Sequence, residues 1–146
     1  MKHLEIEMKT LLTKEEYLLL QANFSEILPI TQKNYYLDTP DFYLRQHKIA
    51  MRIRTFEDSG ELTIKIPQTV GNMEYNQALS LEEATKCLES GKLPQGMILE
   101  ELLSRGISPR DWTVLGCLTT IRYEKATPIG LMALDQSHYF DIVDYE

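Results

Sequence analysis

The amino-acid sequence predicts an α+β protein, in which antiparallel β-strands form a sheet and helices pack against its apolar side. The first observation is an alternation of apolar and polar residues in several short segments separated by turn-forming residues. The second is a pair of capping boxes, at residues 13–16 and 80–83, each of which is expected to start a helix. With 146 residues, the chain suits a single domain over residues 1–146.

The overall charge and the apolar content narrow the class of protein. Lys and Arg number 15 and Asp and Glu 22, so the formal net charge is −7 and no nucleic-acid partner is expected. No apolar run approaches the ~20 residues that span a bilayer, and the first residues do not resemble a secretion signal. Cys87 and Cys117 lack metal-ligand spacing and are expected to be reduced and buried. These features predict a cytoplasmic protein without a membrane partner.

The N-terminal half contains four predicted strands and one helix. The first strand covers residues 4–9, with Leu4, Ile6 and Met8 on an apolar core face. A helix follows Thr13 and ends before Pro29. Further strands are predicted at residues 32–37, 49–56 and 62–66, with turns at residues 38–41 and 58–61.

The C-terminal half returns from helices to strands. Residues 72–79 predict a weaker strand, because this segment has no β-branched residue. One helix follows Ser80 and ends before Gly91, and a second covers about residues 97–103. Pro109 is expected to begin a brief helical turn. Strands are then predicted at residues 113–119, 120–126, 131–135 and 139–146.

Several of these strands carry a row of charged residues opposite an apolar row. The rows are Glu5/Glu7/Lys9, Arg52/Arg54, Thr63/Lys65, Arg122/Glu124 and, on a later strand, Asp135. They could form the solvated face of a two-layer sheet, or the lumen of a closed antiparallel β-barrel with the helices outside. The charge types favour the lumen, because Arg and Lys suit phosphate oxygens and clustered carboxylates hold Mg²⁺ or Mn²⁺. Such a site would suit a polyphosphate substrate.

An ordered set of motifs resembles a known family. Glu5-Ile6-Glu7-Met8-Lys9 resembles the N-terminal ExExK signature of the CYTH family, the triphosphate tunnel metalloenzymes. In order, it is followed by Tyr-Tyr-Leu-Asp-Thr at residues 35–39, Arg-Ile-Arg at 52–54, Leu-Thr-Ile-Lys at 62–65, Arg122 and Leu134-Asp135. The resemblance implies an antiparallel β-barrel tunnel that binds triphosphate groups. The chain is most similar to the bacterial stand-alone members.

The resemblance also implies roles for individual residues. It assigns the divalent metal, Mg²⁺ or Mn²⁺, to Glu5 and Glu7, with Asp135 and Glu146 as further ligands. It assigns the triphosphate to Lys9, Arg52, Arg54, Lys65 and Arg122, and catalysis to Glu5, Glu7 and Lys9. Tyr36 and Asp38 belong to a family motif, but a packing aromatic and a turn explain them adequately.

The expected function is metal-dependent hydrolysis of a triphosphate, with inorganic triphosphate as the favoured substrate. The alternatives are a non-catalytic module that binds polyphosphate or a nucleotide, an adenylate cyclase, and a thiamine triphosphatase. A plain structural barrel with a solvated charged face would bind no triphosphate.

The chain departs from the family pattern in two places. In residues 72–77 only Glu74 matches, weakly, a strand that carries arginine and glutamate in many members. The sequence also ends at Glu146, where the family's second ExE pair would begin, so the barrel is expected to lack its last strands. An exposed strand edge of this kind could pair with a second copy in a homodimer.

Overall fold

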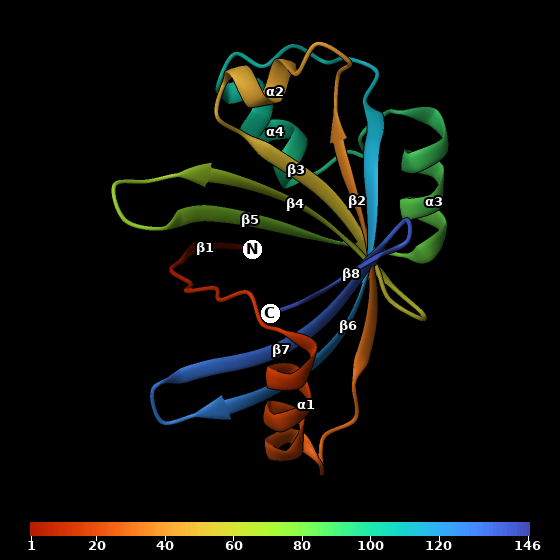
Figure 1. Ribbon diagram of the computed structural model, residues 1–146. Coiled ribbons are helices and arrows are strands. Elements are labelled where there is room, and N and C mark those ends of the chain that lie inside the picture. The colour runs from red at the N-terminus through yellow and green to blue at the C-terminus, as the bar shows by residue number, and fades with distance from the viewer. The chain divides into compact units, whose positions relative to one another are not determined.

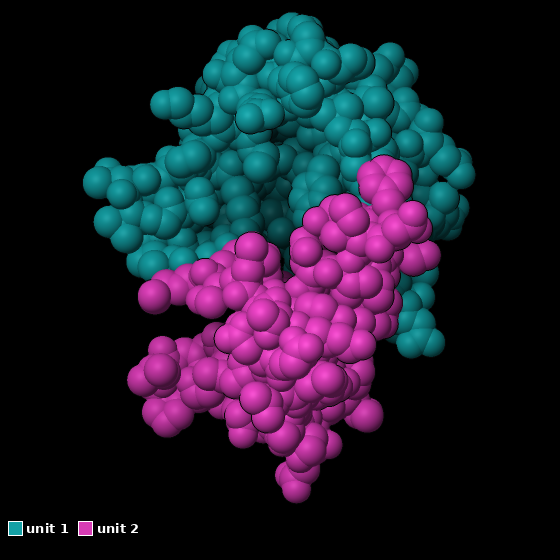
Figure 2. Space-filling view, in the orientation of Figure 1, with its two compact units in different colours: residues 1–7, 34–117 teal, residues 8–33, 118–146 magenta.

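The computed structural model describes residues 1–146, which form two compact units. Unit 1 comprises residues 1–7 and 34–117, and unit 2 comprises residues 8–33 and 118–146 (Figure 2). Two strands, β2 (Ile30–Asp38) and β6 (Thr113–Thr127), run from one unit into the other. The single domain over residues 1–146 therefore stays a prediction.

Unit 1 contains most of the strands and helices (Figure 1). Its strands are β1 (Lys2–Glu5), β3 (Ala50–Thr55), β4 (Gly60–Pro67) and β5 (Asn72–Leu79). Its helices are α2 (Tyr43–Gln46), α3 (Leu81–Ser90) and α4 (Met97–Ser104). The pairs β1·β5, β4·β5 and β3·β4 are all antiparallel.

Unit 2 combines one helix with a three-stranded meander. Helix α1 (Lys14–Gln21) continues into a 3₁₀ turn, η1 (Ala22–Phe24). The second part of β6 pairs with β7 (Gly130–Tyr139), which in turn pairs with β8 (Ile142–Tyr145), and both pairs are antiparallel. Tyr17, Phe24 and Leu134 are buried together and form the core of this unit.

The strands follow the hydrogen-bonded order β1-β5-β4-β3-β2-β6-β7-β8. The predicted α+β class with an antiparallel sheet is therefore confirmed. The predicted closed barrel is not confirmed. Closure requires the two end strands of the order to pair, and here these are β1 and β8, which are not hydrogen-bonded neighbours. Each of these strands has only four residues, so each offers few backbone groups for such pairing. The model contains no helix that is long and apolar enough to cross a membrane.

The core of unit 1 lies between the apolar face of its sheet and its helices. The alternation in β3 and β4 buries Met51, Ile53, Leu62 and Ile64, all 3% exposed or less. Buried side chains of α3 and α4 pack against them: Ala84, Cys87, Ile98 and Leu102. The opposite face of the same strands is left for the charged residues.

Both predicted capping boxes are present, and they start α1 and α3. Thr13 Oγ1 accepts a hydrogen bond from Glu16 N at 3.1 Å, and Thr13 N donates to Glu16 Oε1 at 2.9 Å. Ser80 and Glu83 repeat this exchange at 3.0 Å in both directions. Helix α3 ends at Gly91, which has the left-handed φ of 71° that favours glycine.

The prediction for the first strand is wrong beyond Glu5. Strand β1 ends there, and the presumed core residues Leu4, Ile6 and Met8 are 51%, 65% and 98% exposed. The reason is the partner strand, since β5 begins at Asn72, directly opposite Glu5. Beyond that point β1 has no strand to pair with. Glu7 and Lys9 therefore do not continue a strand face.

Further differences from the sequence predictions lie between Gly106 and the C-terminus. No helical turn begins at Pro109; residues 107–112 are irregular, and Trp112 N donates to Gly91 O at 2.7 Å. The strands predicted at 113–119 and 120–126 form the single 15-residue strand β6, because no turn-forming residue separates them. Cys87 is buried as predicted, whereas Cys117 is exposed.

Candidate functional site

The register of unit 1 brings charged and polar side chains together on one face of its sheet. Arg52 lies opposite Thr63, Thr63 opposite Asn76, and Lys65 opposite Glu74. His3 is in turn opposite Glu74. Directly opposite residues in an antiparallel pair share a face, so these side chains all lie opposite the apolar core. We call this surface the charged face of unit 1.

Lys65 is the centre of the charged face. Its Nζ lies 2.6 Å from Glu5 Oε2, 3.6 Å from Glu74 Oε2 and 4.0 Å from Glu7 Oε1. The sequence assigned Lys65 to the substrate and Glu5 and Glu7 to a metal. The structure brings these three residues together, with the ammonium group in the place that a cation would take among the carboxylates.

Glu74 completes this cluster, although it matches the family pattern only weakly. Its side chain is 9% exposed. Burial raises the pKa of Glu74, but hydrogen bonding with Glu5 and the positive charges of Lys65 and Arg52 outweigh burial and lower this pKa below its usual value. The signal that could have identified Glu74 is its position on β5, the strand that pairs with β1, directly opposite Lys65 of β4.

Two asparagine side chains orient Arg54 and Thr63 of the charged face. Arg54 Nε donates to Asn34 Oδ1 at 2.6 Å, and Thr63 Oγ1 donates to Asn76 Oδ1 at 2.7 Å. Neither asparagine was singled out from the sequence, because an amide between strand residues has no motif of its own. Arg52 differs from Arg54, since its Nε is buried without a hydrogen-bond partner.

The residues of unit 1 suit a divalent metal by type, but they do not form a ready-made ligand set. Glu5 Oε2 and Glu74 Oε2 are buried without hydrogen-bond partners, and carboxylate oxygens are the ligands that Mg²⁺ and Mn²⁺ prefer. The contact of Glu5 with Lys65 is therefore an ion pair and not an aligned hydrogen bond. In neither unit do three or more His, Cys, Asp or Glu side chains gather as metal ligands. Lys65 lies among the carboxylates instead.

Unit 2 holds a separate ion pair made from two of the predicted site residues. Arg122 lies opposite Asp135 and donates to both carboxylate oxygens, from Nε to Oδ1 and from Nη2 to Oδ2, each at 2.8 Å. These hydrogen bonds raise the pKa of Arg122 above its usual value. Asp135, which was predicted as a metal ligand, is thus fully engaged by Arg122.

The two other predicted residues of unit 2 lie in different surroundings. Glu146 is opposite Asp135 in the strand pairing, since Glu146 N donates to Asp135 O at 3.0 Å and Asp135 N to Glu146 O at 2.8 Å. Lys9 lies in the irregular segment before α1. The structure thus divides the predicted site residues between unit 1 and unit 2.

Asp38 has a structural role, as the turn interpretation predicted. Its carboxylate accepts hydrogen bonds from the backbone N–H groups of Thr39, Leu44 and Arg45, at 2.7, 2.8 and 3.2 Å. It therefore holds the start of α2 in place. The packing interpretation of Tyr36 is wrong, because this side chain is 42% exposed.

Comparisons with known proteins agree with the motifs of the sequence. The family model described as CYTH domain matches residues 3–146. A protein of Bacillus subtilis (strain 168) named "Putative triphosphatase YjbK" is 36% identical over an alignment of 151 positions, which covers 99% of this chain and 76% of that protein.

Solved structures show the same fold. A crystal structure from Bacillus halodurans, described as a "putative adenylate cyclase", matches with a TM-score of 0.90 and 36% identity, over 99% of this chain and 78% of that one. The Hippeastrum protein HpAC1 matches in fold with a TM-score of 0.79 at 19% identity, over 92% of this chain and 73% of that one. The family model and the B. subtilis relative each match almost the whole chain, and on this basis the chain belongs to the CYTH domain family.

Proposed function

We propose that this protein hydrolyses a triphosphate substrate in a metal-dependent reaction, with inorganic triphosphate as the favoured substrate. The observation that carries the proposal is the charged face of unit 1, where the Lys65 ammonium lies within ion-pair distance of three carboxylates. The name of the B. subtilis relative supports the same activity. A triphosphate needs both kinds of group, because a metal and basic side chains together neutralise its charge.

The metal, Mg²⁺ or Mn²⁺, would be held by Glu5 and Glu7, with Glu74 beside them. The chemistry that a metal would supply there is neutralisation of phosphate charge and activation of a water molecule. Asp135 and Glu146 of unit 2 remain proposed ligands on the basis of the family resemblance alone.

The basic residues of unit 1 would bind the phosphate groups. Arg52 has a buried Nε without a partner, so it can donate to an anion without breaking an existing hydrogen bond. Arg54 is oriented by Asn34. Lys65 would exchange its carboxylate partners for phosphate oxygens when a metal takes its place among them. Lys9 and Arg122 of unit 2 are proposed as further phosphate ligands.

A second candidate is a module that binds a triphosphate or polyphosphate without hydrolysing it. The observation that favours this candidate is the place of Lys65, whose ammonium group already compensates the carboxylates of a metal site. Binding by the basic residues requires no metal, whereas turnover does. An adenylate cyclase or a thiamine triphosphatase activity would use the same charged face.

The test is phosphate release from inorganic triphosphate with Mg²⁺ or Mn²⁺, for the wild type and for Glu5→Gln/Glu7→Gln. We expect release only with metal, and a loss of at least a hundredfold in the double variant, because its ligand oxygens are replaced by neutral amides. Glu89→Gln, an exposed change on α3, is the matched control and should retain full activity. Triphosphate that raises the melting temperature without being hydrolysed would support the binding module instead. If triphosphate is not hydrolysed and also does not raise the melting temperature, both candidates are contradicted.

A further inference from the structure

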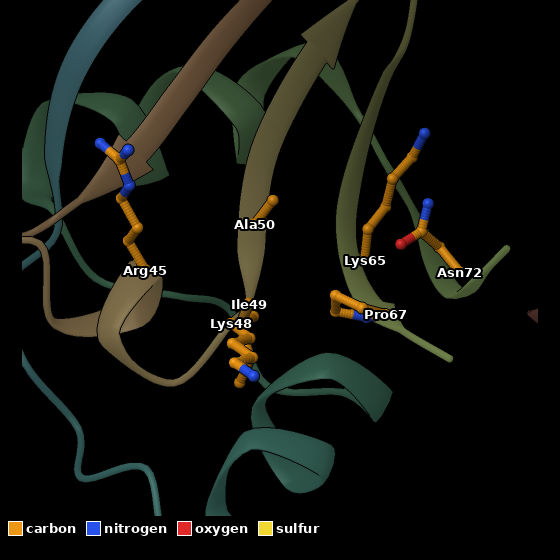
Figure 3. A pocket seen from close by; sticks show the side chains of 7 residues that line it. All are labelled: Arg45, Lys48, Ile49, Ala50, Lys65, Pro67 and Asn72. Atoms are coloured by element: carbon orange, nitrogen blue, oxygen red, sulfur yellow. The ribbon is translucent and has the colours of Figure 1, made fainter. Parts of the chain in front are cut away.

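A cavity of about 310 Å³ opens in unit 1 at the end of the charged face (Figure 3). This volume lies at the lower end of the range of about 300–1,000 Å³ that is usual for small-molecule sites. Three of the lining residues are cationic, Arg45, Lys48 and Lys65, and none is acidic. The amide of Asn72 adds a neutral hydrogen-bonding group. The cavity therefore suits an anion.

Ala50 provides the space for this cavity. It lies opposite Lys65 in the β3–β4 pairing, so its methyl group is on the charged face. It is also the next residue on that face after Arg52, at a distance of about 7 Å along the strand. Figure 3 shows the side chains of Arg45 and Lys65 on either side of Ala50, extending in the same direction. The small side chain thus leaves a gap flanked by a guanidinium and an ammonium group.

Arg45 and Lys48, the two cationic lining residues that are not proposed triphosphate ligands, have no acidic partner. Arg45 and Lys48 are exposed and take part in no ion pair, and the Arg45 guanidinium lies 5.7 Å from the centroid of the Phe42 ring. The backbone beneath Arg45 is held by Asp38, which accepts a hydrogen bond from Arg45 N. The charge of Lys65, in contrast, is compensated by Glu5. Arg45 thus provides an uncompensated positive charge on helix α2, whose first residues are held by Asp38.

We propose that this cavity is an additional phosphate subsite, which holds the fourth phosphate of a linear polyphosphate longer than triphosphate. The inference rests on the proposed function, because Lys65 both lines the cavity and is a proposed triphosphate ligand. A guanidinium group on one side and an ammonium group on the other suit a phosphate, which offers several charged oxygens in different directions. The subsite makes tetrapolyphosphate a better ligand than tripolyphosphate.

The test is calorimetric binding of tripolyphosphate, tetrapolyphosphate and inorganic phosphate to the intact chain without divalent metal, so that no turnover occurs. In the wild type we expect tetrapolyphosphate to bind about tenfold more tightly than tripolyphosphate, the effect of one good charge-assisted contact. Arg45→Gln should remove this preference and leave the tripolyphosphate affinity within about twofold. Ala50→Leu should do the same by filling the gap while all cations remain. Lys86→Gln, an exposed change on α3, is the control for net charge.

The outcomes separate this inference from the proposed function. If tripolyphosphate binds but neither variant changes the preference for tetrapolyphosphate, the subsite is wrong and the proposed function stands. If Arg45→Gln weakens only the binding of inorganic phosphate, the cavity takes free anions, which also overturns the subsite. If the wild type binds no tripolyphosphate without metal, the subsite and the metal-free binding module both fail, whereas metal-dependent hydrolysis is decided by the phosphate-release assay. Melting temperatures near that of the wild type would show that Arg45→Gln and Ala50→Leu are folded.

Discussion

The charged face of unit 1 and the Arg122–Asp135 pair of unit 2 contain the same kinds of residue in different geometries. Arg122 and Asp135 satisfy each other through two parallel hydrogen bonds of 2.8 Å. In unit 1 a single ammonium group is shared among three carboxylates, and Glu5 Oε2, Glu74 Oε2 and Arg52 Nε are buried without hydrogen-bond partners. A satisfied pair stabilises a fold, whereas unsatisfied charged groups are available to a ligand.

The difference follows from the shapes of the two cations. A guanidinium group matches a carboxylate through two donors in a plane, while an ammonium group is a point charge that can serve several acceptors at once. We therefore expect changes to the Arg122–Asp135 pair to lower stability, in addition to removing the proposed phosphate ligand Arg122. Changes in unit 1 should act mainly on the binding of ions and on pH dependence.

The largest effect is expected for Arg122→Gln. This change leaves the Asp135 carboxylate, which is 14% exposed, without its two charge-assisted hydrogen bonds. We expect the free energy of unfolding to fall by about 2 kcal/mol in urea titrations. The double variant Arg122→Gln/Asp135→Asn should recover part of this loss, because no buried charge is then left unpaired. A loss below about 0.5 kcal/mol for the single variant would show that the pair contributes little to stability.

A smaller effect is expected from Glu74 on the pH dependence of stability. The pKa of Glu74 is lower in the folded protein than its ordinary value of 4.5, so the unfolded chain binds more protons in this range. Glu74 therefore adds stability above about pH 4.5, and this contribution is lost as the pH falls through the lowered pKa. Glu74→Gln should make the unfolding free energy less dependent on pH below about pH 4.5.

Urea titrations at several pH values measure this dependence, with Glu89→Gln as the control for an exposed glutamate. An unchanged slope in Glu74→Gln would mean that the charges of Lys65 and Arg52 do not hold Glu74 ionised.

The smallest effect, severalfold in affinity, is expected for metal binding to Lys65→Gln. Removal of the ammonium group takes a competing cation away from Glu5, Glu7 and Glu74. We expect Mn²⁺ to bind about three- to tenfold more tightly, or about 0.7–1.4 kcal/mol, as measured by the electron paramagnetic resonance signal of free Mn²⁺. Addition of Glu5→Gln should reverse the gain. Weaker binding in Lys65→Gln would contradict the competition between Lys65 and the metal.

Parts of both units follow from local pattern. The alternation in β3 and β4 predicted which residues enter the core, and the capping boxes predicted the starts of α1 and α3. Both signals depend on residues close in sequence: the two-residue period of a strand, and the reach of a side chain over one helical turn. The same alternation placed Arg52 and Lys65 on the face opposite the core.

What the sequence by itself determined is therefore the class of most elements, the buried face of β3 and β4, and the set of motifs that marks the family. The tertiary structure decided where strands end and which charges meet. Strand β1 ends at Glu5 because its partner β5 begins at Asn72, and Lys65 meets Glu74 because β4 and β5 pair in one register. Pairing depends on residues far apart in the chain, and no local pattern of either strand specifies its partner.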